Sequence, residues 1–137
     1  MSILIDTNVL LDVMLCRNDF YPDSLAVFEI VETNEINAFV SAVSMTNIFY
    51  ILRKFKHNID DVYSLMDDLS ALFAIAPVTE NTILNAMALR WKDFEDAVQF
   101  MSAQGVNVEY IITRNKPDFE NFEIPCLSPS EYITQFK

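Results

Sequence analysis

The sequence predicts a single α/β domain built around a parallel sheet. Apolar residues alternate along the chain between short continuous runs, typical of buried parallel strands, and runs at helical spacing. No repeat, linker or low-complexity stretch interrupts this alternation. The length of 137 residues suits one domain, and 52% hydrophobic residues provide a core without disulfide or metal staples. We therefore expect residues 1–137 to fold as one unit.

Local patterns predict each element in order. Short apolar runs between polar or turn-forming residues predict strands at 2–5, 38–40, 74–78 and 108–112, with a weaker strand at 124–127. Apolar residues recurring every three or four positions predict helices at 9–14 and 24–31, from 44, from 59, from 80 and from 94 to 105, and a short helix from 129. The alternation indicates strands joined through helices, as in parallel sheets.

Several residues are expected to begin or end these helices. Ser44 is expected to begin one helix, with Asn47 at the N3 position of a capping box. Thr79 and Asp93 are expected to cap the two helices that precede the fourth strand. Gly105 is expected to be the C-cap of the second of these helices.

The composition excludes several classes of site. Gly105 is the only glycine, so the chain has no Walker loop and no glycine-rich dinucleotide motif. His57 is the only histidine, which excludes a His-rich zinc site and any nucleophilic triad that does not use it. Cys16 and Cys126 form no CxxC pair, which suits reduced thiols, although a disulfide between them stays open. Because no apolar run reaches the length of a membrane span and no leader pattern opens the chain, we expect a cytoplasmic protein.

Carboxylates are the abundant chemical groups. The formal net charge is −11, which repels a polyanion over most of the surface, so a nucleic-acid ligand would need a basic track or bound cations. Asp6 and Asp118 each follow an apolar strand, at the sheet edge where parallel α/β folds bind ligands. Asp93 and Asp96 project from one face of a helix start. Acids converging in a cleft need a positive partner, and Mg²⁺ or Mn²⁺ prefers such oxygen ligands.

Four segments of the chain resemble the PIN-domain family in order and spacing. They are MSILIDTNVLLD at 1–12, SMTN at 44–47, DFEDA at 93–97 and IITRNKPDF at 111–119. The resemblance spans nearly the whole chain and is strongest to the VapC-type ribonuclease branch, most of whose small members are toxins paired with an antitoxin. It implies a PIN-like (Rossmann-like) three-layer α/β/α fold, with a central parallel sheet of four to five strands. It also implies a Mg²⁺ or Mn²⁺ site and metal-dependent endonucleolytic cleavage of RNA.

The resemblance also assigns site residues. The family's first, third and fourth acids fall on Asp6, Asp96 and Asp118, which would hold the metal and form the catalytic set. The second acid, usually Glu, is matched here by Asn47, so the site loses one negative charge. Asp93, one turn from Asp96, would restore that charge as a further metal ligand.

Other residues are expected to support the site or the substrate. Supporting polar groups are Thr7, Asn8, Asn47, Thr113 and Asn115. Expected RNA-backbone contacts are Arg114, Lys116, Arg53 and Lys54. For Arg53 and Lys54 there is an alternative explanation: they lie at a solvated helix end, where the negative pole of the helix dipole favours positive charge.

These observations predict a metal-dependent endoribonuclease, the toxin of a type II toxin-antitoxin pair, with RNA as substrate, an antitoxin as partner and a homodimeric state implied by the resemblance. The alternative is a weak or inactive PIN domain that binds RNA or a protein, and Asn47 is its sequence support. A dehalogenase-like phosphatase would need a second Asp where Asn8 stands, and a receiver domain would need an acidic neighbour of Asp6. Neither requirement is met.

Overall fold

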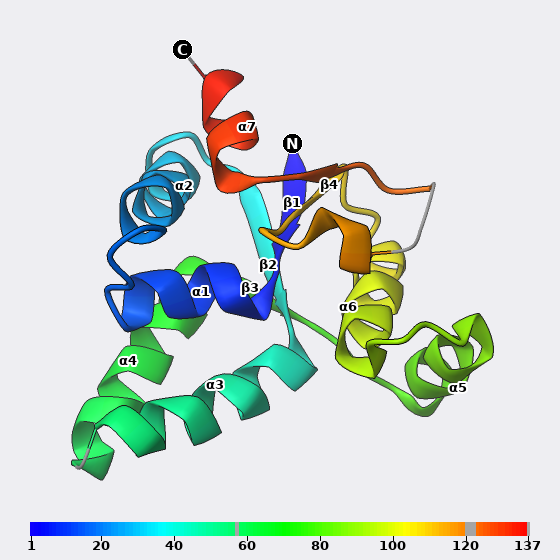
Figure 1. Ribbon diagram of the computed structural model, residues 1–137, viewed down its shortest axis with the longest axis horizontal. Helices are drawn as coiled ribbons and strands as arrows, with labels where there is room; N and C mark the ends of the chain where they lie inside the picture. Colours follow the sequence, from blue (N-terminus) through cyan, green and yellow to red (C-terminus); the bar gives the residue numbers. More distant parts are fainter. Residues whose placement is uncertain (57, 120–122, 137) are drawn as a thin grey trace.

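The computed structural model describes residues 1–56, 58–119 and 123–136. Its centre is a five-stranded parallel sheet, which confirms the predicted parallel sheet of four to five strands, and the strand order is β3-β2-β1-β4-β5 (Figure 1). The strands are β1 (Ser2–Ile5), β2 (Asn37–Ser41), β3 (Ala74–Ala76), β4 (Tyr110–Ile112) and β5 (Cys126–Leu127). The short length of β5 matches the weak apolar pattern that predicted it.

Helices cover both faces of this sheet. They are α1 (Thr7–Met14), α2 (Tyr21–Thr33), α3 (Ala42–Phe55), α4 (Ile59–Leu72), α5 (Glu80–Leu89), α6 (Phe94–Gly105) and α7 (Pro129–Thr134), with a 3-10 helix at Lys116–Asp118. On one side of the sheet, α1 packs on α2 and α2 packs on α7. On the other side, α5 packs on α6, which gives the expected three layers (Figure 1). Within the described part of the chain, no helix has the length and apolarity needed to cross a membrane.

The alternation of side chains along β1 explains why the sheet needs both helical layers. Ile3 and Ile5 are fully buried in the core shared with α1, α2 and α4. Leu4 is fully buried on the opposite face, in the core that Phe100 of α6 completes. A strand with both faces covered has no polar face, so its sequence is continuously apolar.

Two of the predicted helix caps are wrong. Helix α3 begins at Ala42, and its cap is Ser41, whose hydroxyl accepts from the backbone N–H of Val43. Ser44 therefore lies inside the helix, and the predicted capping box with Asn47 is wrong. Helix α6 includes Gly105, and its C-cap is Val106, so the predicted glycine cap is also wrong.

The other two predicted caps are confirmed. Thr79 forms a capping box with Thr82, because each side chain bonds the backbone of the other residue. Asp93 caps α6 by accepting from the backbone N–H of Asp96 at 3.0 Å.

The order of the strands determines where a ligand would bind. The chain passes from β1 to β2 and β3 on one side, then crosses to β4 on the other side of β1. Strands β1 and β4 are in register with Ile5 beside Ile112, so the two chains leave the sheet together. In open α/β sheets, the crevice beyond the carboxyl ends of two such strands is the usual ligand site. Asp6 and Thr113 are the first residues beyond those ends.

Candidate functional site

Asp6 is held firmly at the end of β1. Its backbone N–H continues the sheet by donating to the Ile112 carbonyl at 2.9 Å. Its carboxylate is buried, and each oxygen accepts one hydrogen bond: Oδ1 from Gln99 Nε2 at 2.9 Å and Oδ2 from Thr113 Oγ1 at 2.8 Å. Asp6 precedes α1, but its side chain makes no capping hydrogen bond. The carboxylate is therefore oriented from the α6 and β4 sides and serves the site rather than the helix.

A cavity of about 290 Å³ opens where these elements meet. It is lined by Asp6, Thr7, Asn8, Leu11, Asn47, Tyr50, Ile51, Asp93, Glu95, Asp96, Asn115 and Asp118. All four predicted acids are among these residues, as are four of the five supporting residues. Thr113 is the fifth, and it supports Asp6 through the hydrogen bond described above.

The crowding of carboxylates shifts their proton equilibria. Burial raises the pKa of Asp96 from 3.8 to about 8, and the negative charges of Asp6, Asp93, Asp118 and Glu95 add to the rise. Burial also raises the pKa of Asp6, although the hydrogen bonds from Gln99 and Thr113 oppose that rise. The cavity thus stabilises positive charge, either as protons or as a cation.

The donor set suits a hard divalent cation. Every charged group on the cavity wall is a carboxylate, and the amides of Asn8, Asn47 and Asn115 add neutral oxygens. Among the described residues, no three acidic, His or Cys groups already converge tightly enough to enclose a metal ion. Mg²⁺ does not require such a cage, because it retains several waters and uses one or two carboxylates together with substrate phosphates.

Besides the apolar wall residues Leu11 and Ile51, three residues with polar side chains at the site were not predicted from the sequence. Glu95 lines the cavity and accepts a hydrogen bond from Thr7 Oγ1 at 2.9 Å. Gln99 is fully buried, and within the described residues its Oε1 has no hydrogen-bond partner. Tyr50 lines the cavity with 66% of its surface exposed. Helical spacing carried the signal for two of them, because Gln99 follows Asp96 by three positions and Tyr50 follows Asn47 by three.

Asn47 belongs to the second turn of α3 and faces the same cavity as the acids. Because Ser41 caps the helix, Asn47 has no capping role that would explain its presence there. The residue that matches the family's second acid is therefore at the site, with a neutral side chain.

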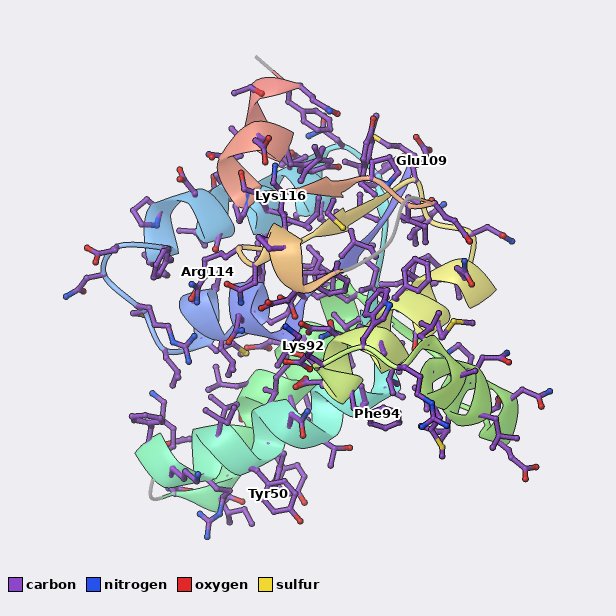
Figure 2. All side chains as sticks on the ribbon, turned by 45° about the vertical axis from the view of Figure 1, so that its right-hand side comes forward. Tyr50, Lys92, Phe94, Glu109, Arg114 and Lys116 are labelled. Carbon is purple, nitrogen blue, oxygen red and sulfur yellow. The ribbon has the colours of Figure 1, made fainter. Side chains whose placement is uncertain are left out.

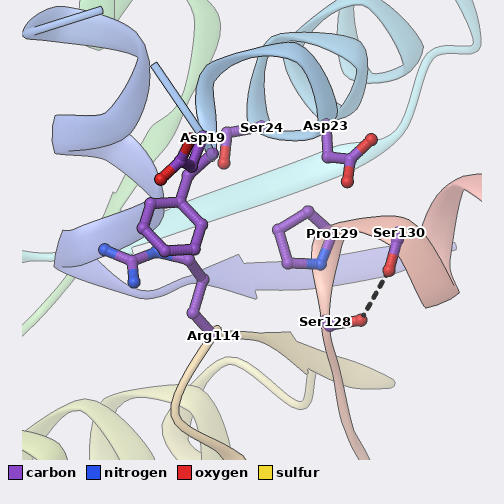
Figure 3. A pocket seen from close by; sticks show the side chains of 8 residues that line it. Asp19, Asp23, Ser24, Arg114, Ser128, Pro129 and Ser130 are labelled. Atoms are coloured by element: carbon purple, nitrogen blue, oxygen red, sulfur yellow. Dashed lines mark hydrogen bonds between the residues drawn. The ribbon is translucent and has the colours of Figure 1, made fainter. Parts of the chain in front are cut away.

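Arg114 lies next to Thr113 in sequence, but its side chain is bound to Asp12 of α1 rather than lining the acid cavity. Its Nε and Nη2 donate to the two carboxylate oxygens of Asp12, at 2.8 and 3.1 Å, and its guanidinium carbon stands 3.8 Å from the centre of the Phe20 ring. Arg114 and Phe20 also line a separate hollow of about 340 Å³, between the start of α2 and the start of α7 (Figure 3). A phosphate contact by Arg114 would compete with Asp12.

The other predicted RNA contacts lie outside the acid cavity. Lys116 donates to Glu131 Oε1 at 2.8 Å, and this pairing lowers the pKa of Glu131 to about 2. Arg53 and Lys54 are exposed in the last turn of α3. Their contacts with RNA stay a prediction. His57, the sole histidine, lies outside the described residues.

Comparison with known proteins defines the class. The sequence profile of the PIN domain matches residues 2–117, and the chain belongs to the PIN-domain family. This confirms the resemblance drawn from the four sequence segments. No match was found among curated proteins.

Solved structures share the fold at low sequence identity. VapBC-1 from nontypeable Haemophilus influenzae is 15% identical over 95% of this chain and 99% of its own, with a TM-score of 0.73. VapBC2 from Rickettsia felis, bound to a DNA fragment from its promoter, is 14% identical over 93% and 98%, with a TM-score of 0.70. A toxin-antitoxin complex from Klebsiella pneumoniae is 22% identical over the same shares, with a TM-score of 0.69. The chain thus shares its fold with these structures over nearly its whole length.

Proposed function

We propose that this protein is a metal-dependent endoribonuclease that hydrolyses RNA phosphodiester bonds. One observation supports this most strongly: the crevice between β1 and β4 gathers Asp6, Asp96 and Asp118 around one cavity. These carboxylates come from positions distant in sequence; Asp6 and Asp96 are buried and Asp118 is exposed, and burial of like charges side by side is a feature of functional sites because it is unfavourable for the fold alone. Membership of the PIN-domain family supports the same reaction class.

The residues of the site fall into metal-binding and positioning groups. Asp6, Asp96 and Asp118 would hold Mg²⁺ or Mn²⁺, which supplies an acidified water and screens the charge of the attacked phosphodiester. Gln99 and Thr113 each fix one oxygen of Asp6, so that its carboxylate keeps one orientation. Thr113 in turn accepts from the backbone N–H of Asn115 at 3.0 Å, which ties the Asp118 loop to β4.

The rim of the cavity suits a single-stranded substrate. Tyr50 on α3 lines the cavity and is exposed; Phe94, which follows Asp93 at the start of α6, is also exposed and lines a neighbouring hollow (both are labelled in Figure 2), and bases stack on such rings irrespective of sequence. Lys92 precedes the Asp93 cap and forms no ion pair with any residue in the described ranges. We propose that it contacts the RNA backbone beside the cavity, together with Lys54 and the other predicted cations.

We also propose that the protein is the toxin of a type II toxin-antitoxin pair. The structure of similar fold from Klebsiella pneumoniae is a toxin-antitoxin complex by its description. The net charge of −11 offers electrostatic complementarity to a basic antitoxin segment. A neighbouring gene for a small DNA-binding protein that copurifies with this chain is the expected finding. Cytoplasmic location and homodimerisation are proposed on the same family grounds, and light scattering tests the latter.

Cleavage of RNA by the purified protein tests the proposed activity. Total RNA is incubated in Mg²⁺ or Mn²⁺, against EDTA and against Asp6→Asn and Asp118→Asn prepared identically, which controls for contaminating ribonuclease. Metal-dependent cutting that both substitutions abolish is expected. Folded, antitoxin-free protein that cuts no RNA in either metal would favour the alternative of a binding module.

A further inference from the structure

The neutral residue at position 47 leaves the site one charge short of the four-acid pattern. Two carboxylates outside the core set of Asp6, Asp96 and Asp118 line the cavity, namely Asp93 and Glu95. Asp93 is exposed, and its Oδ1 already accepts the Asp96 backbone N–H as the cap of α6. Its position is explained by the helix alone.

Glu95 is held across the cavity by a chain of hydroxyls. Thr7 Oγ1 donates to Glu95 Oε2 at 2.9 Å and lies 2.7 Å from Ser44 Oγ. A hydroxyl has a single proton, so Thr7 shares its proton between the two acceptors, Glu95 Oε2 and Ser44 Oγ. This chain connects α6 through α1 to α3, and Ser44 precedes Asn47 by three positions on the same helix. The Glu95 carboxylate is thereby directed towards the side of the cavity where Asn47 stands.

The second oxygen of Glu95 is available to a ligand. Oε1 makes no hydrogen bond within the described residues, and the side chain is half-buried on the cavity wall. The Glu95 charge raises the pKa of Asp6, and it also raises that of Asp96, where it is the smallest of four acidic contributions and Asp93 acts more strongly. Glu95 therefore lies within electrostatic reach of both acids that the family places at the centre of its site.

We propose that Glu95 replaces the acid missing from α3, so that Mg²⁺ or Mn²⁺ is held by Asp6, Asp96, Asp118 and Glu95. This inference rests on the proposed function. It assigns the fourth carboxylate to Glu95, in the first turn of α6, rather than to Asp93, which caps that helix. With Glu95 in the site, the number of carboxylates equals that of the four-acid pattern although Asn47 is neutral. Asn47 then supplies an amide oxygen or a substrate contact.

Direct measurement of Mn²⁺ binding tests this without relying on activity. The free-Mn²⁺ signal in electron paramagnetic resonance gives Kd for the wild type, Glu95→Gln and Asp93→Asn. Glu95→Gln keeps an oxygen that accepts from Thr7 but removes the charge, and Asp93→Asn keeps the cap because Asn caps helices as well as Asp. We expect Glu95→Gln to raise Kd by at least the roughly 10- to 100-fold that loss of an outer-shell group costs. We expect Asp93→Asn to change it less than about threefold, because its charge is exposed and screened.

A rescue variant separates ligation from a general disturbance. Asn47→Glu, introduced together with Glu95→Gln, returns the carboxylate to α3 and is expected to restore most of the affinity. Weaker binding in Asp6→Asn with unchanged binding in Glu95→Gln would overturn the assignment of Glu95 and leave the proposed function standing. Absence of Mn²⁺ binding by the wild type would overturn both. Circular dichroism melts of each variant verify folding.

Discussion

Asp12 offers a sharp test of how the site loop is held in place. Its carboxylate is fully buried and accepts from Arg114 at 2.8 and 3.1 Å, from Arg17 at 3.4 Å and from Ser24 at 3.2 Å. Asp12→Asn removes the charge and sets an amide N–H₂ group against these donors. Arg114 is then left 20% exposed and without its counter-charge.

The loss of stability expected for Asp12→Asn follows from the burial of the Asp12 carboxylate. Removing one partner of a fully buried ion pair costs about 3–5 kcal/mol. Arg114 and Arg17 keep some solvent contact, at 20% and 34% exposure, so we expect a loss of about 2–3 kcal/mol. With an unfolding entropy of about 2.1 cal/mol/K per residue, a chain of 137 residues loses about 3.5 °C of Tm per kcal/mol, which predicts a fall of roughly 7–10 °C.

Urea unfolding and thermal melts measure this loss. Asp19→Asn and Asp23→Asn make the same charge change at exposed positions of the neighbouring hollow and are expected to cost less than about 0.5 kcal/mol. Asp12→Asn combined with Arg114→Gln should cost less than the two changes added, because the second removes the stranded charge. A loss for Asp12→Asn within about 1 kcal/mol of the exposed controls would refute the reasoning.

Three further predictions concern the cavity. Because the pKa of Asp96 rises from 3.8 in the unfolded chain to about 8, the folded state binds the extra proton between these values; in EDTA this group should lower the free energy of unfolding by up to about 1.4 kcal/mol per pH unit as pH rises through this window, and Asp96→Asn should remove that contribution and leave the one from Asp6, whose pKa is also raised. Tyr50→Ala should raise KM for single-stranded RNA by roughly 5- to 150-fold, the factor for losing about 1–3 kcal/mol of stacking, whereas Tyr63→Ala on α4 should leave it unchanged; equal KM values would exclude stacking on Tyr50. Thr113→Val should destabilise the fold by about 1–3 kcal/mol and weaken Mn²⁺ binding, since it removes the donor to Asp6, and Thr113→Ser should preserve both properties.

The sequence predicted the sheet and the main acids because both depend on local patterns. Ile3, Leu4 and Ile5 form a continuous apolar run, and such a run requires cover on both faces of the sheet. Asp6 follows that run directly, so its place at the carboxyl end of β1 needed no tertiary information. The predicted start of α3 at Ser44 was wrong, because Ser41 and Ser44 are both good caps and the pairing of Ser41 with Ala76 in β3 decides between them.

The remaining features depend on contacts between distant segments. Arg114 is only four residues from Asp118, but its partner Asp12 is 102 positions away, and no local pattern indicates that pairing. Glu95 was missed because its neighbour Asp96 matched the family acid, and only the hydroxyl of Thr7, 88 positions away, shows where Glu95 points. Gln99 is a polar residue on a buried helix face. Only the tertiary structure explains it, because its amide donates a hydrogen bond to Asp6.

The origin of the oxygen in the RNA products tests the central claim most directly. Labelled single-stranded RNA is cut in Mn²⁺ by the wild type in water enriched in oxygen-18, with Asp6→Asn as the control for contaminating ribonuclease. Attack by an activated water predicts oxygen-18 in a terminal phosphate of the products, with no product formed by Asp6→Asn or in EDTA. Unlabelled 2′,3′-cyclic phosphate ends would indicate attack by the RNA's own hydroxyl, and that result, or cutting that survives EDTA, would contradict a carboxylate-held metal as the catalyst.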